Sequence, residues 1–292
     1  MNGNGRRLNA PLALGSIALV VLAAAMVQRA LEAPGASDAI RGALVGSGFA
    51  ALATAVGALP ALALKSVSDR AESVMLGFAA GVMLAASAFS LVVPAIDVGE
   101  ALFGGRLAAS LLAATAIGAG ALVMIGIDRT VPHEHRHLGR HGMQAQWRRV
   151  WLLVLAMLIH NVPEGMAIGV AFSGADPADG IPIATAIAIQ DLPEGLVVAL
   201  ALRSIGYKPA AAVLIAGGTG LAEPVGAVLA SAVTAFTPAL YPFGLALAAG
   251  AMLFVVSHEI IPETHRKGHQ LPATLGVVGG FAVMMMLDNA FA

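Results

Sequence analysis

The stretch 156–198 contains two related motifs, His160-Asn161-Val162-Pro163-Glu164-Gly165 and Gln190-Asp191-Leu192-Pro193-Glu194-Gly195. Each motif places two adjacent polar residues, a spacer and a proline before a glutamate and a glycine, inside an apolar run. On a helix, the first polar residue and the glutamate are four positions apart and share one face, and the second polar residue lies beside them. Two such helices facing each other bring six polar side chains into one small volume: His160, Asn161, Glu164, Gln190, Asp191 and Glu194.

The prolines and the carboxylates add to this pattern. Pro163 and Pro193 lack an N–H, so they are expected to kink both helices and to free backbone oxygens near the polar patch. A carboxylate near the middle of a membrane costs about 2.5–3.5 kcal/mol on insertion scales. No Lys or Arg lies within either apolar run to balance it. A bound divalent cation is the natural counter-charge, and the alternative is a pair of kinked helices bonded to each other by polar side chains.

The composition indicates a membrane protein. The chain of 292 residues is 58% hydrophobic and 11% charged, and its mean hydropathy is +0.85. These values exclude a water-soluble domain of this length. Cysteine is absent, which excludes disulfides, thiolate metal sites and a cysteine nucleophile. The fold class predicted is therefore an all-α polytopic membrane protein.

Apolar runs of about 20 residues, bounded by charges or by Pro and Gly, mark the expected spans. An accessory span is expected at 11–31, and no signal-peptide cleavage pattern follows Arg6 and Arg7, so it is expected to be retained. Spans one to eight are expected at 39–64, 73–96, 107–127, 150–172, 181–202, 209–235, 240–261 and 271–291. The predicted parts of this single membrane domain are a tail with the accessory helix (1–38), spans one to three (39–127), a polar loop (128–149) and spans four to eight with the metal site (150–292).

The positions of Lys and Arg predict an orientation. Of the 16 Lys and Arg residues, all except Arg29, Arg41 and Arg106 fall in loops on one side of the expected spans. Cytoplasmic loops carry the excess of positive residues. The N-terminus is therefore expected in the cytoplasm and the C-terminus outside.

An internal repeat is visible between spans two and seven. Span two reads Ala79-Ala80-Gly81-Val82-Met83-Leu84, and span seven reads Ala248-Ala249-Gly250-Ala251-Met252-Leu253. Because these spans cross in opposite directions, the match favours an inverted repeat of spans one to three against spans six to eight.

The polar loop at 128–149 is rich in histidine. It carries His133, Glu134, His135, His137 and His141 on the expected cytoplasmic side. Such a cluster suits transient capture of metal ions. The alternative interpretation, a solvated polar loop without a metal role, remains open at this point.

Glu223 in span six is a further acidic residue at membrane depth, next to Pro224. With it, two adjacent cation sites can be assembled: the first from His160, Glu164, Gln190 and Glu194, and the second from Asn161, Asp191 and Glu223, with Glu164 and Glu194 bridging. Imidazole, carboxylate and amide ligands suit zinc, and also ferrous iron, manganese or cadmium. Met83 is a possible extra ligand, although a lone Met is more often a packing residue.

The double motif, with its His-Asn-x-Pro-Glu-Gly and x-Asp-x-Pro-Glu-Gly forms, resembles the ZIP (Zrt/Irt-like) family of divalent-metal transporters, in particular its prokaryotic members with a binuclear site. The resemblance covers spans one to eight; the accessory first span departs from the eight-span pattern of the family. It implies that the metal ligands are Met83, His160, Asn161, Glu164, Gln190, Asp191, Glu194 and Glu223.

The resemblance implies further features. Asp97 and Asp288 match acidic positions at the family's metal entrance, and the cytoplasmic release route would involve His258, Glu259, Glu263, His265 and His269. The implied function is uptake of zinc (Zn2+), with cadmium (Cd2+), iron or manganese as other substrates, into the cytoplasm of a bacterium through its inner membrane. The implied partners are metal ions, the lipid bilayer and a second copy in a homodimer, and not nucleic acid. An elevator-like motion of spans one, four, five and six against two, three, seven and eight is also implied.

Three other functions are alternatives to a metal carrier. An intramembrane metalloprotease would need H-E-x-x-H, but Pro262 stands where the second histidine after His258 and Glu259 is required. The protein is therefore not expected to be an enzyme. A metal-selective channel would use the same ligands as a carrier, and a metal sensor without flux is the third possibility; the sequence separates neither of them from a carrier.

Overall fold

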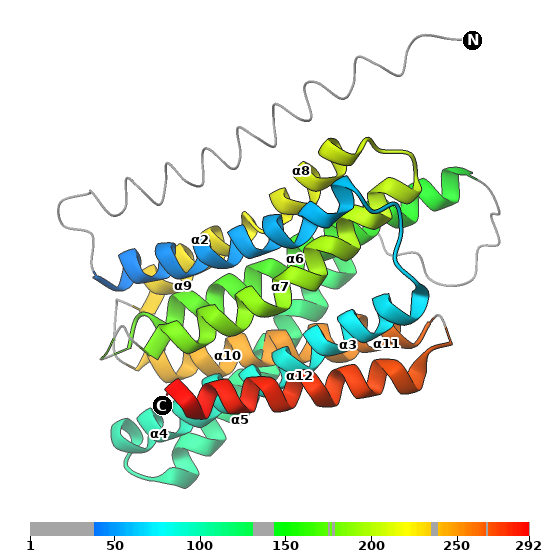
Figure 1. Ribbon diagram of the computed structural model, residues 1–292. Helices are drawn as coiled ribbons and strands as arrows, with labels where there is room; N and C mark the ends of the chain where they lie inside the picture. Colours follow the sequence, from blue (N-terminus) through cyan, green and yellow to red (C-terminus); the bar gives the residue numbers. More distant parts are fainter. Residues whose placement is uncertain are drawn as a thin grey trace, which may run out of the picture.

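The computed structural model describes residues 38–130, 143–174, 176, 179–234, 239–266 and 268–291. Over these residues the secondary structure is helical and contains no strand (Figure 1). Eight helices are long and apolar enough to cross a membrane: Asp38–Leu62, Asp69–Phe103, Arg106–Ile127, Val150–Ala171, Gly180–Ser204, Pro209–Thr234, Leu240–His265 and Gln270–Ala290. They coincide with predicted spans one to eight, so the all-α polytopic fold is confirmed. The predicted accessory helix at 11–31 lies outside the described residues.

Several spans are assembled from more than one helical segment. Span one comprises α2 (Asp38–Ala58) and the 3-10 turn η1 (Leu59–Leu62), and span two comprises α3 (Asp69–Ala85), the π-helical η2 (Ala86–Val92) and α4 (Val93–Phe103). Spans three to five are α5 (Arg106–Thr130), α6 (Met143–Ala171) and α7 (Gly180–Ser204). Span six comprises α8 (Pro209–Thr219) and α9 (Ala222–Thr234). Span seven comprises α10 (Leu240–Val255), the π-helical η4 (Val256–Ile260) and α11 (Ile261–His265), and span eight is α12 (Gln270–Phe291).

The prolines in these spans have different consequences. α6 and α7 continue through Pro163 and Pro193, so the expected kinks do not end either helix. Span six, in contrast, is divided into α8 and α9. Pro224 has no N–H for the carbonyl of Gly220, and the N–H of Glu223 bonds that oxygen instead, at 3.1 Å. This tight turn places Glu223 in the first turn of α9.

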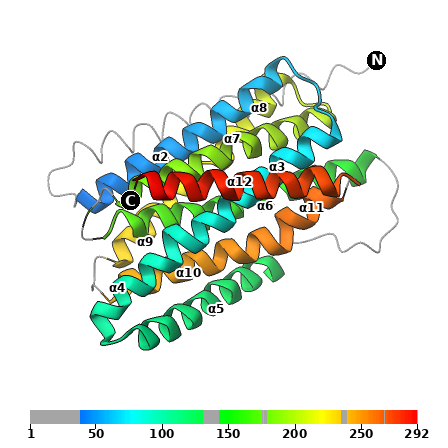
Figure 2. The same cartoon turned by 60° about the horizontal axis from the view of Figure 1, so that its bottom comes forward.

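Glycines hold the helices in four closely packed pairs: α2 with α7, α6 with α9, α3 with α12, and α5 with α10 (Figures 1 and 2). In each pair, a Cβ added to a glycine would overlap a carbonyl oxygen of the partner helix. The pairs of glycine and carbonyl residue are Gly57 with Leu192, Gly226 with Val162, Gly81 with Val277, and Gly250 with Ile117. Because lipid gives no hydrophobic force between helices, such close backbone packing is a main source of association in membranes.

These contacts repeat the inverted symmetry that the sequence suggested. A separation of 169 residues relates Thr54 to Glu223, and the same separation relates Gly57 to Gly226 and Gly81 to Gly250. Gly57 and Gly226 contact equivalent positions of the two polar motifs, Leu192 and Val162. The pairing of spans one and five is thus repeated by spans six and four, with the polar motifs at the symmetry axis.

The two π-helical segments follow the same symmetry. η2 and η4 lie at corresponding places in spans two and seven, shortly after the Ala-Ala-Gly-x-Met-Leu match. Pro94 and Pro262 lie two residues past them, and each leaves the carbonyl four residues earlier without its helical partner. A π turn widens the helix locally, and such turns, although rare, occur frequently at functional sites.

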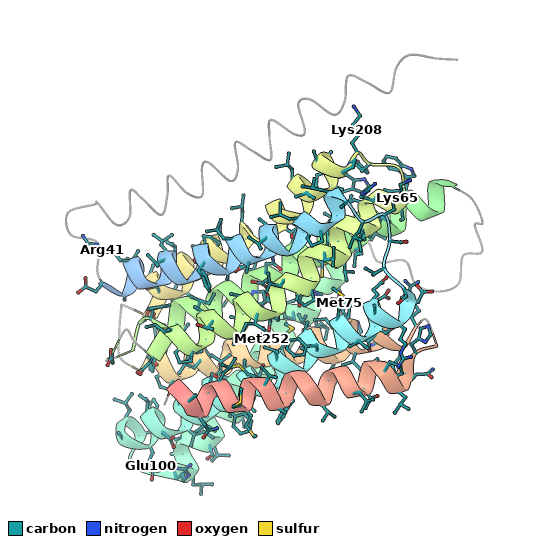
Figure 3. The ribbon with its side chains drawn as sticks, in the orientation of Figure 1. Arg41, Lys65, Met75, Glu100, Lys208 and Met252 are labelled. Atoms are coloured by element: carbon teal, nitrogen blue, oxygen red, sulfur yellow. The ribbon has the colours of Figure 1, made fainter. Side chains whose placement is uncertain are left out.

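The charged side chains gather at the two ends of the bundle. Figure 3 shows Lys65 and Lys208 at one end and Arg41 and Glu100 at the other. The end with Lys65 and Lys208 carries the turns between spans one and two, five and six, and seven and eight. The central part of the bundle is apolar, apart from the polar cluster described below.

We predict that Gly81→Ala destabilises the protein, because its methyl group would overlap the carbonyl of Val277 and separate α3 from α12. Overpacking of this kind typically costs about 1–3 kcal/mol. Thermal unfolding of the purified protein in detergent measures the effect. Gly118→Ala on α5 is the matched control, since nothing lies within 4 Å of a Cβ there; equal melting temperatures for both variants would contradict the packing argument.

Candidate metal centre

Three carboxylates meet between α6 and α7. One ligand oxygen each of Glu164, Asp191 and Glu194 lies within 4.8 Å of the other two. All three side chains are at most 2% exposed. The spacing of the two motifs therefore produces the convergence that it predicts, with Glu164 from α6 and the other two from α7.

The glycine of each motif explains why the two helices and their neighbours come so close. A Cβ on Gly165 would overlap the carbonyl oxygen of Glu223 in α9, and a Cβ on Gly195 would overlap that of Thr54 in α2. The residue after each glutamate must therefore be glycine for the flanking helix to approach. Through the first of these contacts, Glu223 reaches the edge of the cluster, and it is fully buried there.

The remaining motif residues are also buried. His160, Asn161 and Gln190 are at most 3% exposed. The amide nitrogen of Gln190 donates a hydrogen bond of 2.6 Å to Oε1 of Glu164, which links the two motifs directly. Each of the six predicted motif residues thus lies in the interior of the bundle, as does Glu223.

Many polar atoms of this cluster lack hydrogen-bond partners among the described residues. They are Glu164 Oε2, Gln190 Oε1, Asp191 Oδ2, Glu194 Oε1, Glu223 Oε2 and both ring nitrogens of His160. Buried polar atoms are nearly always hydrogen-bonded in proteins, so a concentration of exceptions calls for a missing partner. These atoms are oxygen and nitrogen acceptors or ligands of the kind that divalent metals bind.

Among the described residues, the carboxylates of the cluster have no Lys or Arg beside them as a counter-ion. In the part of the chain that the structure describes, the buried charged residues include no Lys and no Arg. Arg106 and Arg266 form ion pairs at the ends of the bundle instead, with Asp97 and Glu263 respectively. Like charges at this distance repel strongly in a medium of low dielectric constant. A divalent cation between the carboxylates removes that repulsion.

His160 points to a different partner from the three carboxylates. Its Nε2 lies 3.1 Å from Oε2 of Glu259 in η4, although the angles are not those of a hydrogen bond. Neither residue belongs to the group of Glu164, Asp191 and Glu194. His160, one helical turn before Glu164 on α6, therefore lies next to one of the predicted release residues.

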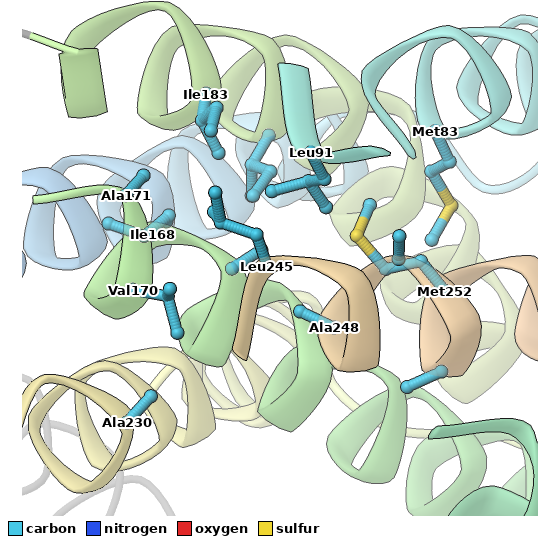
Figure 4. Packing of buried hydrophobic residues seen from close by; sticks show 14 of the residues in the cluster. Met83, Leu91, Ile168, Val170, Ala171, Ile183, Ala230, Leu245, Ala248 and Met252 are labelled. Carbon is cyan, nitrogen blue, oxygen red and sulfur yellow. The ribbon is translucent and has the colours of Figure 1, made fainter. Parts of the chain in front are cut away.

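Met83 lies in the apolar core. It is 1% exposed and packs in one hydrophobic cluster with Met252, its counterpart in the inverted repeat. Figure 4 shows both side chains on facing helices, α3 and α10. This position satisfies the packing role of Met83, and its role as a metal ligand stays a prediction.

The predicted entrance residues lie towards the end of the bundle that carries Glu100. Asp97 is largely exposed and pairs with Arg106 at 3.1 Å. Asp288 in α12 accepts a hydrogen bond of 2.5 Å from Ser90 in η2. The two acidic residues thus have separate partners, and Asp288 connects span eight to the π-helical segment of span two.

The predicted release residues divide into two groups. Glu259 lies beside His160 in the interior of the bundle, and the ring of His258 stacks on Phe254, with centroids 4.9 Å apart. Glu263 instead accepts two hydrogen bonds from Arg266 near the surface, and Nδ1 of His265 lies 2.9 Å from both Thr264 Oγ1 and the carbonyl of Ile261. His269 lies just before α12 and is half-buried. His133, Glu134, His135, His137 and His141 lie outside the described residues.

The fold defines a polytopic membrane protein, and its interior holds a cluster of carboxylates of the type that binds divalent cations. Comparison with known sequences gives the family. The sequence profile described as ZIP zinc transporter matches residues 129–288. The zinc transporter ZIPB of Bordetella bronchiseptica is 49% identical over 84% of this chain and 79% of its own length.

More distant relatives agree. The zinc transporter GufA of Myxococcus xanthus is 41% identical over 84% of this chain and 97% of its own length. The zinc transporter ZupT of Corynebacterium efficiens is 37% identical over 81% of this chain and 92% of its own length. The chain belongs to the ZIP family, whose members among these relatives are named as transporters and not as enzymes.

One contact of the cluster was not predicted from the sequence. The hydroxyl of Thr54 in α2 lies 3.5 Å from Oε1 of Glu223. A single Thr in an apolar span belongs to no recognisable motif, so the sequence around Thr54 does not mark it as a site residue. The inverted repeat did give one, because Thr54 stands at the position equivalent to Glu223.

We predict that Asp191→Asn raises the thermal stability of the metal-free protein, since it removes one of three mutually repelling buried charges. The same variant is expected to lose most of the stabilisation that zinc gives to the wild type, because an amide oxygen is a weaker ligand. Melting curves with a chelator and with added zinc measure both effects. A lower melting temperature in chelator would contradict the view that the charges lack compensation.

Proposed function

We propose that this ZIP family member carries zinc (Zn2+) across the membrane through the carboxylate cluster between α6 and α7. The observation that carries the proposal is the set of buried, uncompensated oxygens of Glu164, Asp191 and Glu194, and the names of the relatives support zinc as the substrate. Cadmium (Cd2+) is proposed as a substitute, because it accepts the same imidazole and carboxylate ligands.

Two neighbouring ions are proposed to bind. Glu164 and Glu194 would bridge them, since each lies at helical spacing from both polar residues of its own motif. The first ion would add His160 and Gln190, with Met83 as a further ligand, and the second would add Asn161, Asp191 and Glu223. The proximity of Asp191 to both bridging glutamates supports this arrangement.

We propose the bacterial inner membrane as the location, with transport into the cytoplasm. The clustering of Lys and Arg at one end of the bundle supports a cytoplasmic position for that end. Asp97 and Asp288 would then attract metal ions at the outer end. The histidines of the loop at 128–149 would assist release and not recognition.

A carrier mechanism is proposed in preference to a channel. The closest packing joins α2 with α7 and α6 with α9, which supports one body of spans one, four, five and six. The second body, of spans two, three, seven and eight, is supported by the pairs α3–α12 and α5–α10. Sliding of the first body would expose the site to either side in turn. A homodimer, proposed from the family, would hold the second body fixed.

The route of release is proposed to begin at Glu259. Its carboxylate already lies 3.1 Å from His160 and is 23% exposed, so it is well placed to take an ion from that ligand. Glu263 is occupied by Arg266 and is the less suitable acceptor. Protons compete with metal at imidazole and carboxylate ligands, so entry of protons into the emptied site would favour release.

We predict that Glu164→Ala removes both bound metals, or nearly so, and abolishes zinc uptake, because it deletes a bridging ligand. Asn161→Ala is expected to weaken mainly the second site. Elemental analysis of the purified proteins and zinc uptake into liposomes measure the two effects.

Glu100→Gln is the matched control, since this glutamate is exposed and pairs with Arg106 at the end of the bundle. It should bind and transport as the wild type does. Metal content near that of the wild type in Glu164→Ala would contradict the assigned site, and uptake that never saturates with zinc concentration would favour a channel.

We predict that His258→Ala combined with Glu259→Ala slows metal exit and leaves zinc at Glu164, Asp191 and Glu194 bound at equilibrium. The reason is that the exit route loses its first ligands while the carboxylate cluster is intact. Stopped-flow mixing measures the rate at which zinc passes from the protein to a chelator enclosed in the liposomes. This rate of exit is distinct from the amount of zinc bound at equilibrium. Glu263→Gln serves as the comparison and should slow exit less; unchanged exit in the double variant would show that His258 and Glu259 have no part in it.

A further inference from the structure

Thr54 is set apart from the other buried hydroxyl residues of the bundle. It is 3% exposed, and its Oγ1 lies 3.4 Å from the carbonyl of Ala50 and 3.5 Å from Oε1 of Glu223. Among the described residues, the Thr54 hydroxyl is the buried hydroxyl that contacts Glu223, at the edge of the carboxylate cluster. The hydroxyl has a single proton to donate, so the two oxygens compete for it.

Other buried hydroxyls donate their hydrogen bond to a carbonyl oxygen of their own helix. The hydroxyl-to-carbonyl distance is 2.6 Å for Ser47, 2.8 Å for Ser87, 2.7 Å for Thr219 and 3.0 Å for Thr234. At 3.4 Å, the bond from Thr54 to Ala50 is the weakest of this set. A carboxylate is a stronger acceptor than a carbonyl oxygen, so the position of this hydroxyl between the two favours donation to Glu223.

The backbone holds Thr54 firmly at this place. Its carbonyl oxygen lies against Gly195, the glycine that follows the bridging Glu194. A Cβ on Gly220, at the break between α8 and α9, would lie 2.9 Å from its hydroxyl oxygen. Thr54 therefore lies where α2, α7 and the start of α9 converge, and it occupies the inverted-repeat position of Glu223 itself.

We infer that Thr54 is a positioning residue of the second metal site, which donates a hydrogen bond to Oε1 of Glu223 and thereby directs the free Oε2 towards the ion. The inference rests on the proposed function. Glu223 Oε2 has no hydrogen-bond partner in the described part of the protein, which leaves it for the metal. Glu223 follows a break in span six, so no regular helical turn precedes it to restrict its side chain. The contact with Thr54, on another helix, restricts the side chain instead.

The effect should be confined to one ion. Thr54 touches Glu223, which is proposed for the second site, whereas the ligands proposed for the first site lie on α6 and α7, with Met83 on α3. Partners of metal ligands typically contribute about 10- to 100-fold to affinity. Loss of the hydroxyl should therefore weaken the second ion by about that factor, and leave the first ion in place.

The test compares Thr54→Val, which keeps the shape and removes the hydroxyl, with Thr54→Ser, which keeps the hydroxyl. Full-length protein in detergent is titrated with zinc, and bound metal is counted by elemental analysis after gel filtration. We expect two ions for the wild type and Thr54→Ser, and one tightly held ion for Thr54→Val. Thr234→Val is the matched control, because this buried hydroxyl donates to the carbonyls of Ala230 and Ser231 in its own helix, and the variant should retain two ions.

A double-mutant cycle keeps the test decisive. In a Glu223→Gln background, Thr54→Val should cause no further loss of zinc affinity, because Thr54 acts through the Glu223 carboxylate. A further loss of about tenfold or more, or full retention of both ions in Thr54→Val alone, would overturn the role of Thr54. Should Thr54→Val not fold, Thr54→Ala in both backgrounds gives the same comparison. A wild type without bound zinc would overturn the proposed function instead.

Discussion

The repulsion between Glu164, Asp191 and Glu194 is the interaction on which the rest of the structure depends. Three carboxylates within 4.8 Å of one another, in a bundle with no buried Lys or Arg among the described residues, are unfavourable without a cation. Two neighbouring side chains, those of Gln190 and Glu223, also keep a potential ligand oxygen without a hydrogen-bond partner among the described residues. Gln190 uses its nitrogen to hold Glu164 and leaves its oxygen unbonded, and Glu223 leaves its Oε2 unbonded. A site arranged in this way binds an ion strongly only while the surrounding helices keep it closed, which suits a cargo that must later leave.

The helix pairs give this cluster a frame with two-fold pseudo-symmetry. Gly165 lies against Glu223 of α9, and Gly195 lies against Thr54 of α2. The two motif glycines thus allow close approach of two helices that are equivalent in the inverted repeat. Symmetry of the backbone does not extend to the side chains at the axis. One half supplies the carboxylate of Glu223 and the other supplies the hydroxyl of Thr54. Similarly, η4 supplies Glu259 to His160, whereas η2 supplies Ser90 to Asp288. The two halves therefore share a fold but place different side chains at the two ends of the proposed metal path.

The sequence predicts much of this because its signals are local. Apolar run lengths locate all eight described spans, and helical spacing alone predicts that Glu164, Asp191 and Glu194 converge. The match around Gly81 and Gly250 predicts the inverted repeat, and both glycines do make equivalent contacts. What the sequence does not predict depends on neighbours that are distant along the chain. The contact of Thr54 with Glu223, and that of His160 with Glu259, arise only once the helices are packed. The π turns before Pro94 and Pro262 and the division of span six at Pro224 depend on how the freed carbonyls find partners, which periodicity does not encode.

In the proposed function, the carboxylate cluster binds the transported ion. Anomalous X-ray diffraction at the zinc absorption edge, from crystals of the full chain soaked in zinc, tests it most directly. We expect a strong anomalous peak between Glu164, Asp191 and Glu194, with a second peak within a few ångströms, on the side of Asn161 and Glu223. An empty cluster, with anomalous density elsewhere in the bundle or none at all, would contradict it.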